Sequence, residues 1–182
     1  MNNVFKTHLK TFEPKLSTKP VEVCSAVAIL ICGAEAEEEV LMFQRAHRDK
    51  DPWSGHIAFP GGRQEEQDES LWHTAVRETR EEMGVELEKA EYLGQLNDLH
   101  HPKIMVSAFV FHMSQKPQLK PNYEVHKAFW LELKELFNEE NHSKRLFQTF
   151  SGEHRLPSVA INGVVVWGIS LSFLSQIEAM WT

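Results

Sequence analysis

The sequence predicts an α/β/α sandwich, an α+β arrangement in which a mixed β-sheet lies between helices. Two observations lead to this fold class: apolar runs of strand length recur along the chain, and two amphipathic stretches have helical spacing. The 182 residues are enough for one domain with a substantial core. We expect that domain over residues 20–182, after an N-terminal arm over residues 1–19 in which Pro14 breaks regular structure.

The first half of the predicted domain contains a hairpin, a loop and the clearest helix. Val21–Ile31 and Val40–Arg45 are apolar runs joined by the acidic turn GAEAEEE, as in two paired strands. The turn-rich stretch HRDKDPWSGH predicts a loop, and a short extended piece follows it. Ser70–Met83 has a helical stripe, and Gly84 is expected to end the helix. The inward positions of this helix are Leu71, Ala75, Val76, Thr79 and Met83.

The second half is predicted to complete the sheet and to add the other long helix. The amphipathic stretch Ile169–Trp181 is expected to form that helix, and Leu133–Asn138 a short one. The expected strands are Tyr92–Leu96, Ile104–Met113, Ala128–Leu131 and Val164–Val166.

Charge and composition narrow the classes of function. The formal net charge is −7, with no basic block, which argues against binding to nucleic acid or to an anionic membrane. No apolar run approaches the roughly 20 residues that span a bilayer, and the amino terminus lacks the apolar segment of a secretory signal. A cytoplasmic protein is therefore expected. Cys24 and Cys32 lie on one predicted strand, too far apart to form a disulfide, so we expect free thiols.

Three glutamates, Glu78, Glu81 and Glu82, share one turn of the predicted helix. Carboxylates this close repel one another, whereas a hard divalent cation would remove that cost. The preceding turn, Gly61-Gly62, allows the backbone to approach a ligand, and its carbonyl groups are further oxygen ligands. The alternative is a solvated helix face on which neighbouring arginines screen the glutamates. The glycines and the spacing favour a metal site.

The stretch from Gly62 to Val85 resembles the Nudix box, G-x5-E-x7-R-E-U-x-E-E-x-G-U, where U is apolar. From Glu69 onward the spacing fits, but the distance from Gly62 to Glu69 is one residue too long, and Asp68 stands at the spacing expected from Gly62. This extra residue resembles the coenzyme A diphosphatase-like branch, which carries FPGG and then D-x-S-L-x-x-T-A-x-R-E-T. Upstream, Lys50 stands where that branch usually has an arginine. The resemblance covers residues 20–180.

The resemblance implies the Nudix fold with a loop-helix-loop box, and hydrolysis of a nucleoside diphosphate linked to another moiety with Mg²⁺ or Mn²⁺. It implies that Arg77 orients either Glu69 or Asp68. Glu124, in the segment PNYEV, matches a position that supplies a further metal ligand or a general base. The metal ligands that it implies are Glu78, Glu81, Glu82 and the carbonyl of Gly61, and the catalytic residues are Glu78, Glu81, Arg77 and Glu124.

Arg45, Trp53 and Gly62 are candidates for contact with the substrate. Arginine binds phosphate groups well, although a structural ion pair explains Arg45 almost equally. Trp53 could stack on a base or on a pantetheine chain, and a buried loop anchor is an equal alternative.

Three functions remain open from the sequence. The leading one is a metal-dependent diphosphatase acting on coenzyme A or a derivative. The second is a Nudix hydrolase for NADH, ADP-ribose, dinucleoside polyphosphates or oxidised dNTPs. The third is a non-catalytic binding module with the same fold, disfavoured because all three box glutamates are present. The expected partner is a small nucleotide conjugate, with neither nucleic acid nor a membrane. Many family members are homodimers, but no residue here marks an interface.

Overall fold

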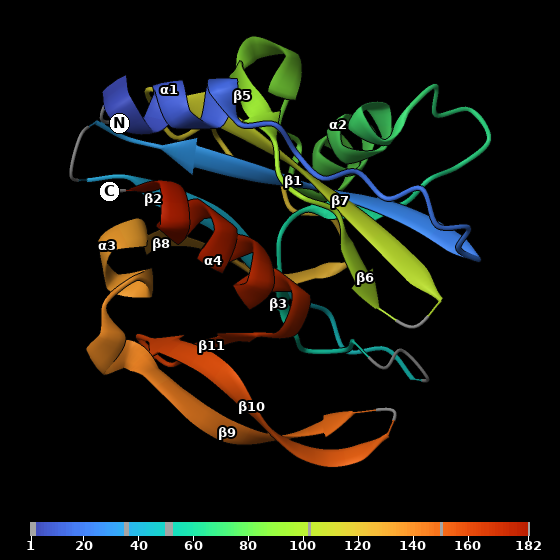
Figure 1. The fold of residues 1–182 in the computed structure, drawn as a ribbon, viewed down its shortest axis with the longest axis vertical. Helices are drawn as coiled ribbons and strands as arrows, with labels where there is room; N and C mark the ends of the chain where they lie inside the picture. Colours follow the sequence, from blue (N-terminus) through green and yellow to red (C-terminus); the bar gives the residue numbers. More distant parts are fainter. Residues whose placement is uncertain (1–2, 35–36, 50–52, 102, 150, 182) are drawn as a thin grey trace.

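The computed structural model describes residues 3–34, 37–49, 53–101, 103–149 and 151–181 (Figure 1). In these residues a large sheet of eight strands is accompanied by a second sheet of three strands and by four α-helices. The strands of the large sheet are β1 (Val23–Cys32), β2 (Glu39–Arg45), β3 (Ile57–Ala58), β4 (Gly61–Arg63), β5 (Glu91–Gln95), β6 (Leu99–His101), β7 (Ile104–Met113) and β8 (Val125–Glu132).

The remaining elements follow the same chain order. The second sheet contains β9 (His142–Thr149), β10 (Gly152–Ile161) and β11 (Val164–Trp167), and the α-helices are α1 (Asn3–Thr11), α2 (Leu71–Met83), α3 (Leu133–Leu136) and α4 (Gly168–Trp181). Two short 3₁₀ turns span Leu87–Lys89 and Glu139–Asn141.

Strand β1 lies in the middle of the large sheet, and this position explains why its sequence is almost continuously apolar. It pairs in parallel with β7, from Val23 opposite Ile104 to Cys32 opposite Met113, and antiparallel with β2 and β4. The strand order is β3-β2-β1-β7-β5, and β8 pairs with β2. The mixed sheet and the hairpin of the first two strands are therefore confirmed.

Helices cover both faces of the large sheet. Successive side chains of a strand point to opposite faces, and β1 shows this alternation: Ile29 packs in one apolar cluster with residues of α1 and α4, whereas Leu30 packs in the other with residues of α2. The predicted α/β/α sandwich is confirmed, with α2 on one face and α1 and α4 on the other.

The segment expected as an N-terminal arm, residues 1–19, contains a helix that packs against the rest of the chain. Residues Asn3–Thr11 form α1, in which Phe5 and Leu9 are each 1% exposed. The ring of Phe5 contacts Trp181 of α4 at a centroid distance of 4.8 Å. Further along, the backbone N–H of Ser17 donates to Asp98 Oδ2 at 2.7 Å. The segment therefore packs on its own chain.

The sequence prediction also omitted the hairpin of β9 and β10, which extends beyond the rest of the fold (Figure 1). Side chains are buried only at its base, where Val159 and Ile161 join the core with Val166 of β11. Most of β9 is exposed on both faces. A strand without a buried face has no apolar alternation, so the usual signal is missing.

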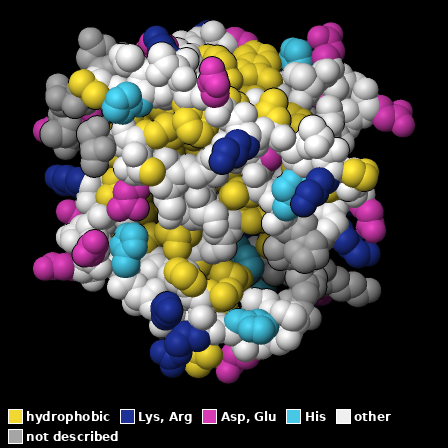
Figure 2. Space-filling model, viewed as in Figure 1, with side chains coloured by type: hydrophobic (Ala, Val, Ile, Leu, Met, Phe, Trp, Pro, Cys, Tyr) yellow, Lys and Arg dark blue, Asp and Glu magenta, His cyan; other side chains and the backbone are white. Residues whose placement is uncertain are grey.

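Both cysteines are free thiols, and charged side chains of both signs share the surface. Cys24 and Cys32 are free, as expected, and burial raises the pKa of the Cys32 thiol to about 12. On the face shown in Figure 2, lysine and arginine side chains are scattered among acidic ones. Within the described residues, no helix combines the length and the apolar character required to cross a membrane.

Candidate active site

Helix α2 has a defined start and a defined end. Ser70 caps its first turn by accepting a hydrogen bond from the backbone N–H of His73 at 3.3 Å. Gly84 ends it in the left-handed conformation, with φ at 67°, and donates its N–H to the carbonyl of Arg80. Ala75 and Met83 are fully buried against the sheet. The expected helix, its stripe and its glycine stop are confirmed, and its remaining face carries the charged residues.

The glycine turn lies directly against these charged residues because β4 pairs with β1, the strand on which α2 packs. Gly61 has φ at 153°, and a Cβ there would overlap the carbonyl of Ala26. A Cβ on Gly62 would overlap the carboxylate of Glu78. Position 61 therefore requires glycine, and the absence of a side chain at Gly62 leaves room for the Glu78 carboxylate beside the backbone of β4.

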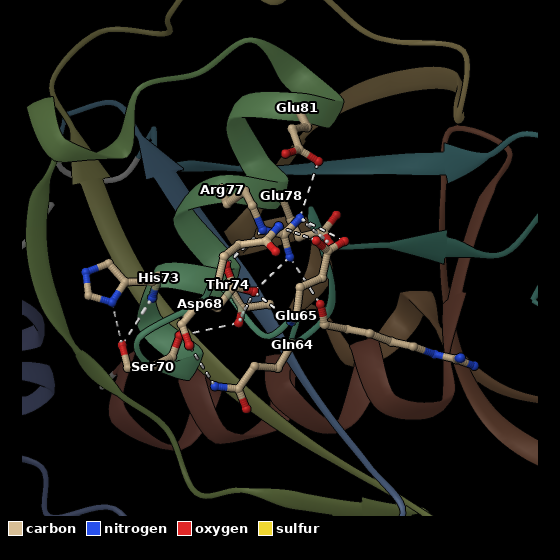
Figure 3. A network of polar contacts seen from close by, with 11 residues as sticks. Gln64, Glu65, Asp68, Ser70, His73, Thr74, Arg77, Glu78 and Glu81 are labelled. Carbon is tan, nitrogen blue, oxygen red and sulfur yellow. Dashed lines mark hydrogen bonds and ion pairs between the residues drawn. The ribbon is translucent and has the colours of Figure 1, made fainter.

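Arg77 is the centre of the polar network (Figure 3). Its guanidinium donates from Nε to Asp68 Oδ1 and from Nη2 to Asp68 Oδ2, both at 2.9 Å. Nη1 donates to Glu78 Oε1 at 3.0 Å and to Glu81 Oε2 at 3.3 Å, and Nη2 also reaches the carbonyl of Arg63 at 3.1 Å. One arginine thus links the loop before α2 to two glutamates of the helix.

Asp68, and not Glu69, is the acid that Arg77 contacts. The Asp68 side chain is 3% exposed, and its Oδ2 also accepts the backbone N–H of Glu65 and the hydroxyl of Thr74. The Arg77 hydrogen bonds hold the pKa of Asp68 well below its usual range. Glu69 is 85% exposed and lies 3.9 Å from His73. The structure therefore resolves the two alternatives left by the sequence in favour of Asp68.

The three box glutamates have different environments. Glu82 is 2% exposed, and its Oε2 accepts the N–H of Gly61 at 2.9 Å. Burial raises the pKa of Glu82 to about 8, in opposition to the Gly61 hydrogen bond, and the charge of Glu78 raises it further. Burial also raises the pKa of Glu78, although Arg77 opposes this. Glu81 is 53% exposed and points toward Arg77. A nearby cation would favour the charged forms of both Glu78 and Glu82.

Glu124 is brought to the same place by a segment far along the chain. The backbone N–H of Lys120 donates to the carbonyl of Met83 at 2.7 Å, and that of Asn122 donates to the carbonyl of Glu82 at 2.9 Å. The segment is thereby attached to the end of α2. The charge of Glu124 contributes to the raised pKa values of Glu78 and Glu82, as expected of a carboxylate in the same site.

Arg45 and Trp53 have less defined roles. The positive charge of Arg45 lowers the pKa of Glu82, so Arg45 lies close enough to the acidic site to interact with that carboxylate. Trp53 is half-buried, and its carbonyl accepts the backbone N–H of His56. Lys50 lies outside the described residues. Arg48, which the sequence analysis did not single out, pairs with Glu124. No spacing rule would have found it, because its partner lies 76 positions away.

The donor set suits a hard divalent cation. Four carboxylates, those of Glu78, Glu81, Glu82 and Glu124, come from α2 and the adjacent segment beside a glycine turn, and oxygen ligands of this kind are those that Mg²⁺ prefers. In their present arrangement, no three histidine, cysteine, aspartate or glutamate side chains of the described chain converge closely enough to hold an ion. The metal ligands therefore stay a prediction.

A family model described as the NUDIX domain matches residues 24–150. The chain belongs to the Nudix family. The matched region runs from β1 to β9 and includes the glycine turn, the Nudix helix α2 and Glu124.

Three relatives in this family match different shares of the chain. An uncharacterised protein of Schizosaccharomyces pombe is 40% identical over 107 residues, which are 53% of this chain and 32% of that protein. The human mitochondrial coenzyme A diphosphatase NUDT8 is 30% identical over 132 residues, 70% of this chain and 55% of that protein. An uncharacterised Nudix hydrolase NudL of Pectobacterium atrosepticum is 26% identical over 163 residues, 88% and 85%. The matches thus span less than two thirds of the first two relatives.

Solved structures support the fold. The Nudix domain of Shewanella oneidensis NrtR, crystallised with ADP ribose, matches with a TM-score of 0.60 and 18% identity over 100% of both chains. The Ap4A hydrolase of Caenorhabditis elegans matches with a TM-score of 0.51 and 19% identity, over 62% of this chain and 81% of that one. At such identities the likeness concerns the fold alone, and the predicted Nudix fold is confirmed.

Proposed function

We propose that this Nudix protein is a metal-dependent pyrophosphohydrolase that cleaves the diphosphate of a nucleoside diphosphate linked to another moiety. The observation that carries this proposal is the arrangement of the site: the buried Glu82 and the partly buried Glu78 lie beside the turn of Gly61 and Gly62, and Arg77 donates a hydrogen bond to Glu78. A solvated helix face would not need such close backbone packing.

The residues of the site divide into proposed metal ligands and a residue that orients them. Glu78, Glu81 and Glu82 would hold Mg²⁺ or Mn²⁺, together with the carbonyl of Gly61. Such an ion neutralises the diphosphate and lowers the pKa of a bound water. Arg77, anchored by Asp68, keeps the glutamates oriented.

Glu124 would accept the proton of the attacking water, because it is attached to the end of α2 from outside the box and is 30% exposed. Gly62 allows the phosphates to approach the backbone, and Arg45 and Trp53 stay candidates for contact with the rest of the substrate.

For the substrate we propose coenzyme A or a derivative. The support is the FPGG and D-x-S-L pattern and the 30% identity to the human coenzyme A diphosphatase. That relative is named as mitochondrial, and for this chain a cytoplasmic location stays a prediction, as does a homodimer.

The test is incubation of the purified protein with coenzyme A and Mg²⁺ or Mn²⁺, with products identified by mass. We expect 4′-phosphopantetheine and adenosine 3′,5′-bisphosphate, and loss of both on chelation. In H₂¹⁸O, one product should carry the label and thereby identify the phosphorus atom that is attacked. Absence of cleavage would reject coenzyme A, and NADH, ADP-ribose, dinucleoside polyphosphates and oxidised dNTPs would then be assayed.

The substitutions Glu81→Gln and Glu82→Gln test whether turnover depends on the box. Each should abolish metal-dependent cleavage while the circular dichroism spectrum is retained. Full activity in both variants, or failure of the wild type on the whole panel, would reject the proposed hydrolysis and favour a binding module.

A further inference from the structure

Arg48 lies in the loop after β2 and contacts the segment that carries Glu124. Its Nη2 is 3.1 Å from Glu124 Oε1, and its guanidinium carbon lies 5.2 Å from the ring centroid of Tyr123. The backbone of Arg48 is fixed by Ser54, whose Oγ accepts the Arg48 N–H at 2.9 Å and donates to the Arg48 carbonyl at 2.8 Å. The loop thus presents this arginine in a defined place.

That place is the edge of the acidic site. The backbone N–H of Ala46 donates to the carbonyl of Glu124 at 2.7 Å, which joins the start of the loop to the segment beside α2. The side chain of Glu124 in turn influences Glu78 and Glu82 electrostatically. Arg48 therefore contacts Glu124, and Glu124 in turn interacts with the carboxylates that would surround the reacting diphosphate.

The other arginine at these carboxylates has little capacity for a ligand. Arg77 is 12% exposed and donates to both oxygens of Asp68, to two glutamates and to a carbonyl. Arg48 is 41% exposed, and among the described residues its ion pair uses Nη2 alone. A guanidinium has five N–H donors in a fork that fits two phosphate oxygens. Arg48 can therefore bind an anion without leaving Tyr123.

We infer that Arg48 is a substrate-binding residue that exchanges Glu124 for a phosphate oxygen of the substrate. This inference rests on the proposed hydrolysis of a nucleoside diphosphate conjugate. An anionic substrate is repelled by the site's carboxylates, and Arg48 supplies an attractive contact at the entrance. Its departure also releases Glu124 Oε1, so that this oxygen can accept a proton from water. Binding of the substrate phosphate to Arg48 and release of the Glu124 carboxylate therefore occur together.

The first measurement is equilibrium binding of coenzyme A, and of ADP-ribose in parallel, with EDTA present. Arg48→Gln should raise Kd about tenfold to a hundredfold, since a hydrogen bond to a charged group is lost. Arg48→Lys should recover part of the affinity, because it keeps the charge but loses the fork. The matched control is Arg155→Gln, an exposed arginine on β10, which should leave Kd unchanged.

A double-mutant cycle with Glu124→Gln tests the exchange itself. If Glu124 competes with substrate for Arg48, Glu124→Gln should tighten binding several-fold in the wild-type background and lower kcat. In the Arg48→Gln background that tightening should disappear. Equal tightening in both backgrounds would mean that Glu124→Gln acts only by removing a negative charge, and it would overturn the proposed exchange.

Failure of this inference is distinct from failure of the proposed function. If the wild type neither binds nor cleaves any compound of the panel, both fall. If the wild type cleaves its substrate while Arg48→Gln keeps the same Kd and KM, only the role of Arg48 falls. Melting temperatures of all variants separate these outcomes from misfolding.

Discussion

Helices α1 and α2 cover opposite faces of the same sheet, but they are held in place by different interactions. Helix α1 is attached by buried apolar side chains, Phe5 and Leu9, and by exposed ion pairs from Lys6 and Lys10 to Glu91. Helix α2 also buries an apolar stripe, yet its other face carries Glu82 almost fully removed from water. Burial of a carboxylate costs stability. Every contact of α1 therefore stabilises the fold, whereas the burial of Glu82 offsets part of the stability that the apolar stripe of α2 provides.

The largest effect should come from the core contact of α1. We expect Phe5→Ala to lower the free energy of unfolding by about 3–5 kcal/mol, because a fully buried aromatic ring leaves a cavity. Leu146→Ala is the matched control, since Leu146 is 56% exposed on β9, and its effect should stay within about 0.5 kcal/mol. Urea denaturation measures both. A small change for Phe5→Ala would mean that the contact of α1 with the core contributes little to the stability of the fold.

The next effect concerns the network of α2. Asp68→Ala removes the buried partner of Arg77 and should lower the free energy of unfolding by about 3 kcal/mol, at the low end for a broken buried ion pair because Arg77 keeps its contacts to Glu78 and Glu81. Glu69→Ala should be nearly neutral, because Glu69 is 85% exposed. Chemical denaturation and turnover of the two variants check this. The reverse ranking would restore Glu69 as the orienting acid.

A divalent cation bound at the glutamates of α2 should stabilise the folded protein. At a concentration one hundred times its Kd, an ion bound only to the folded state adds about 2.7 kcal/mol to the free energy of unfolding. We expect Mg²⁺ or Mn²⁺ to raise the melting temperature of the wild type and of Leu146→Ala, and to have little effect on Glu82→Gln. An equal increase in all three proteins would place the ion outside the box.

The smallest effect should be the pH dependence of the attachment of α1. Hydrogen bonds from Lys10 and Lys6 lower the pKa of Glu91 from 4.5 to about 2. A lowered pKa means that the ionised form stabilises the folded state, so this contribution is present above about pH 4.5 and is lost as pH falls toward 2. Glu91 is 39% exposed, so solvent screening limits the contribution to less than about 1 kcal/mol.

Glu91→Gln should therefore lower the free energy of unfolding at neutral pH by less than about 1 kcal/mol, leave it almost unchanged near pH 2, and so flatten this part of the acid limb of a stability-versus-pH curve. Denaturation midpoints between pH 2 and pH 7 measure the difference. An unaltered acid limb in Glu91→Gln would exclude this ion pair as an acid-sensitive attachment.

Local patterns explain which parts could be predicted from the sequence. Helix α2 has a serine cap, a 3.6-residue stripe and a glycine stop, so its boundaries differ from the prediction only at the cap. Strands β1 and β7 are almost continuously apolar because both of their faces are covered. By contrast, α1 has nine residues, below the length at which an isolated helix is stable, and gains its stability from Phe5 and Leu9 in the core.

Residues close together in the chain were enough to predict the Nudix box and the helix that carries Glu78, Glu81 and Glu82, because a helix cap, a 3.6-residue stripe and a glycine stop are local features. Folding of distant segments is needed to bring Arg77 to Asp68, Arg48 to Glu124, and Phe5 and Leu9 of α1 into the core. The physical reason is the range of the interactions: helix caps and periodicity act over a few residues, whereas an ion pair or a buried ring depends on which distant segments the sheet brings together.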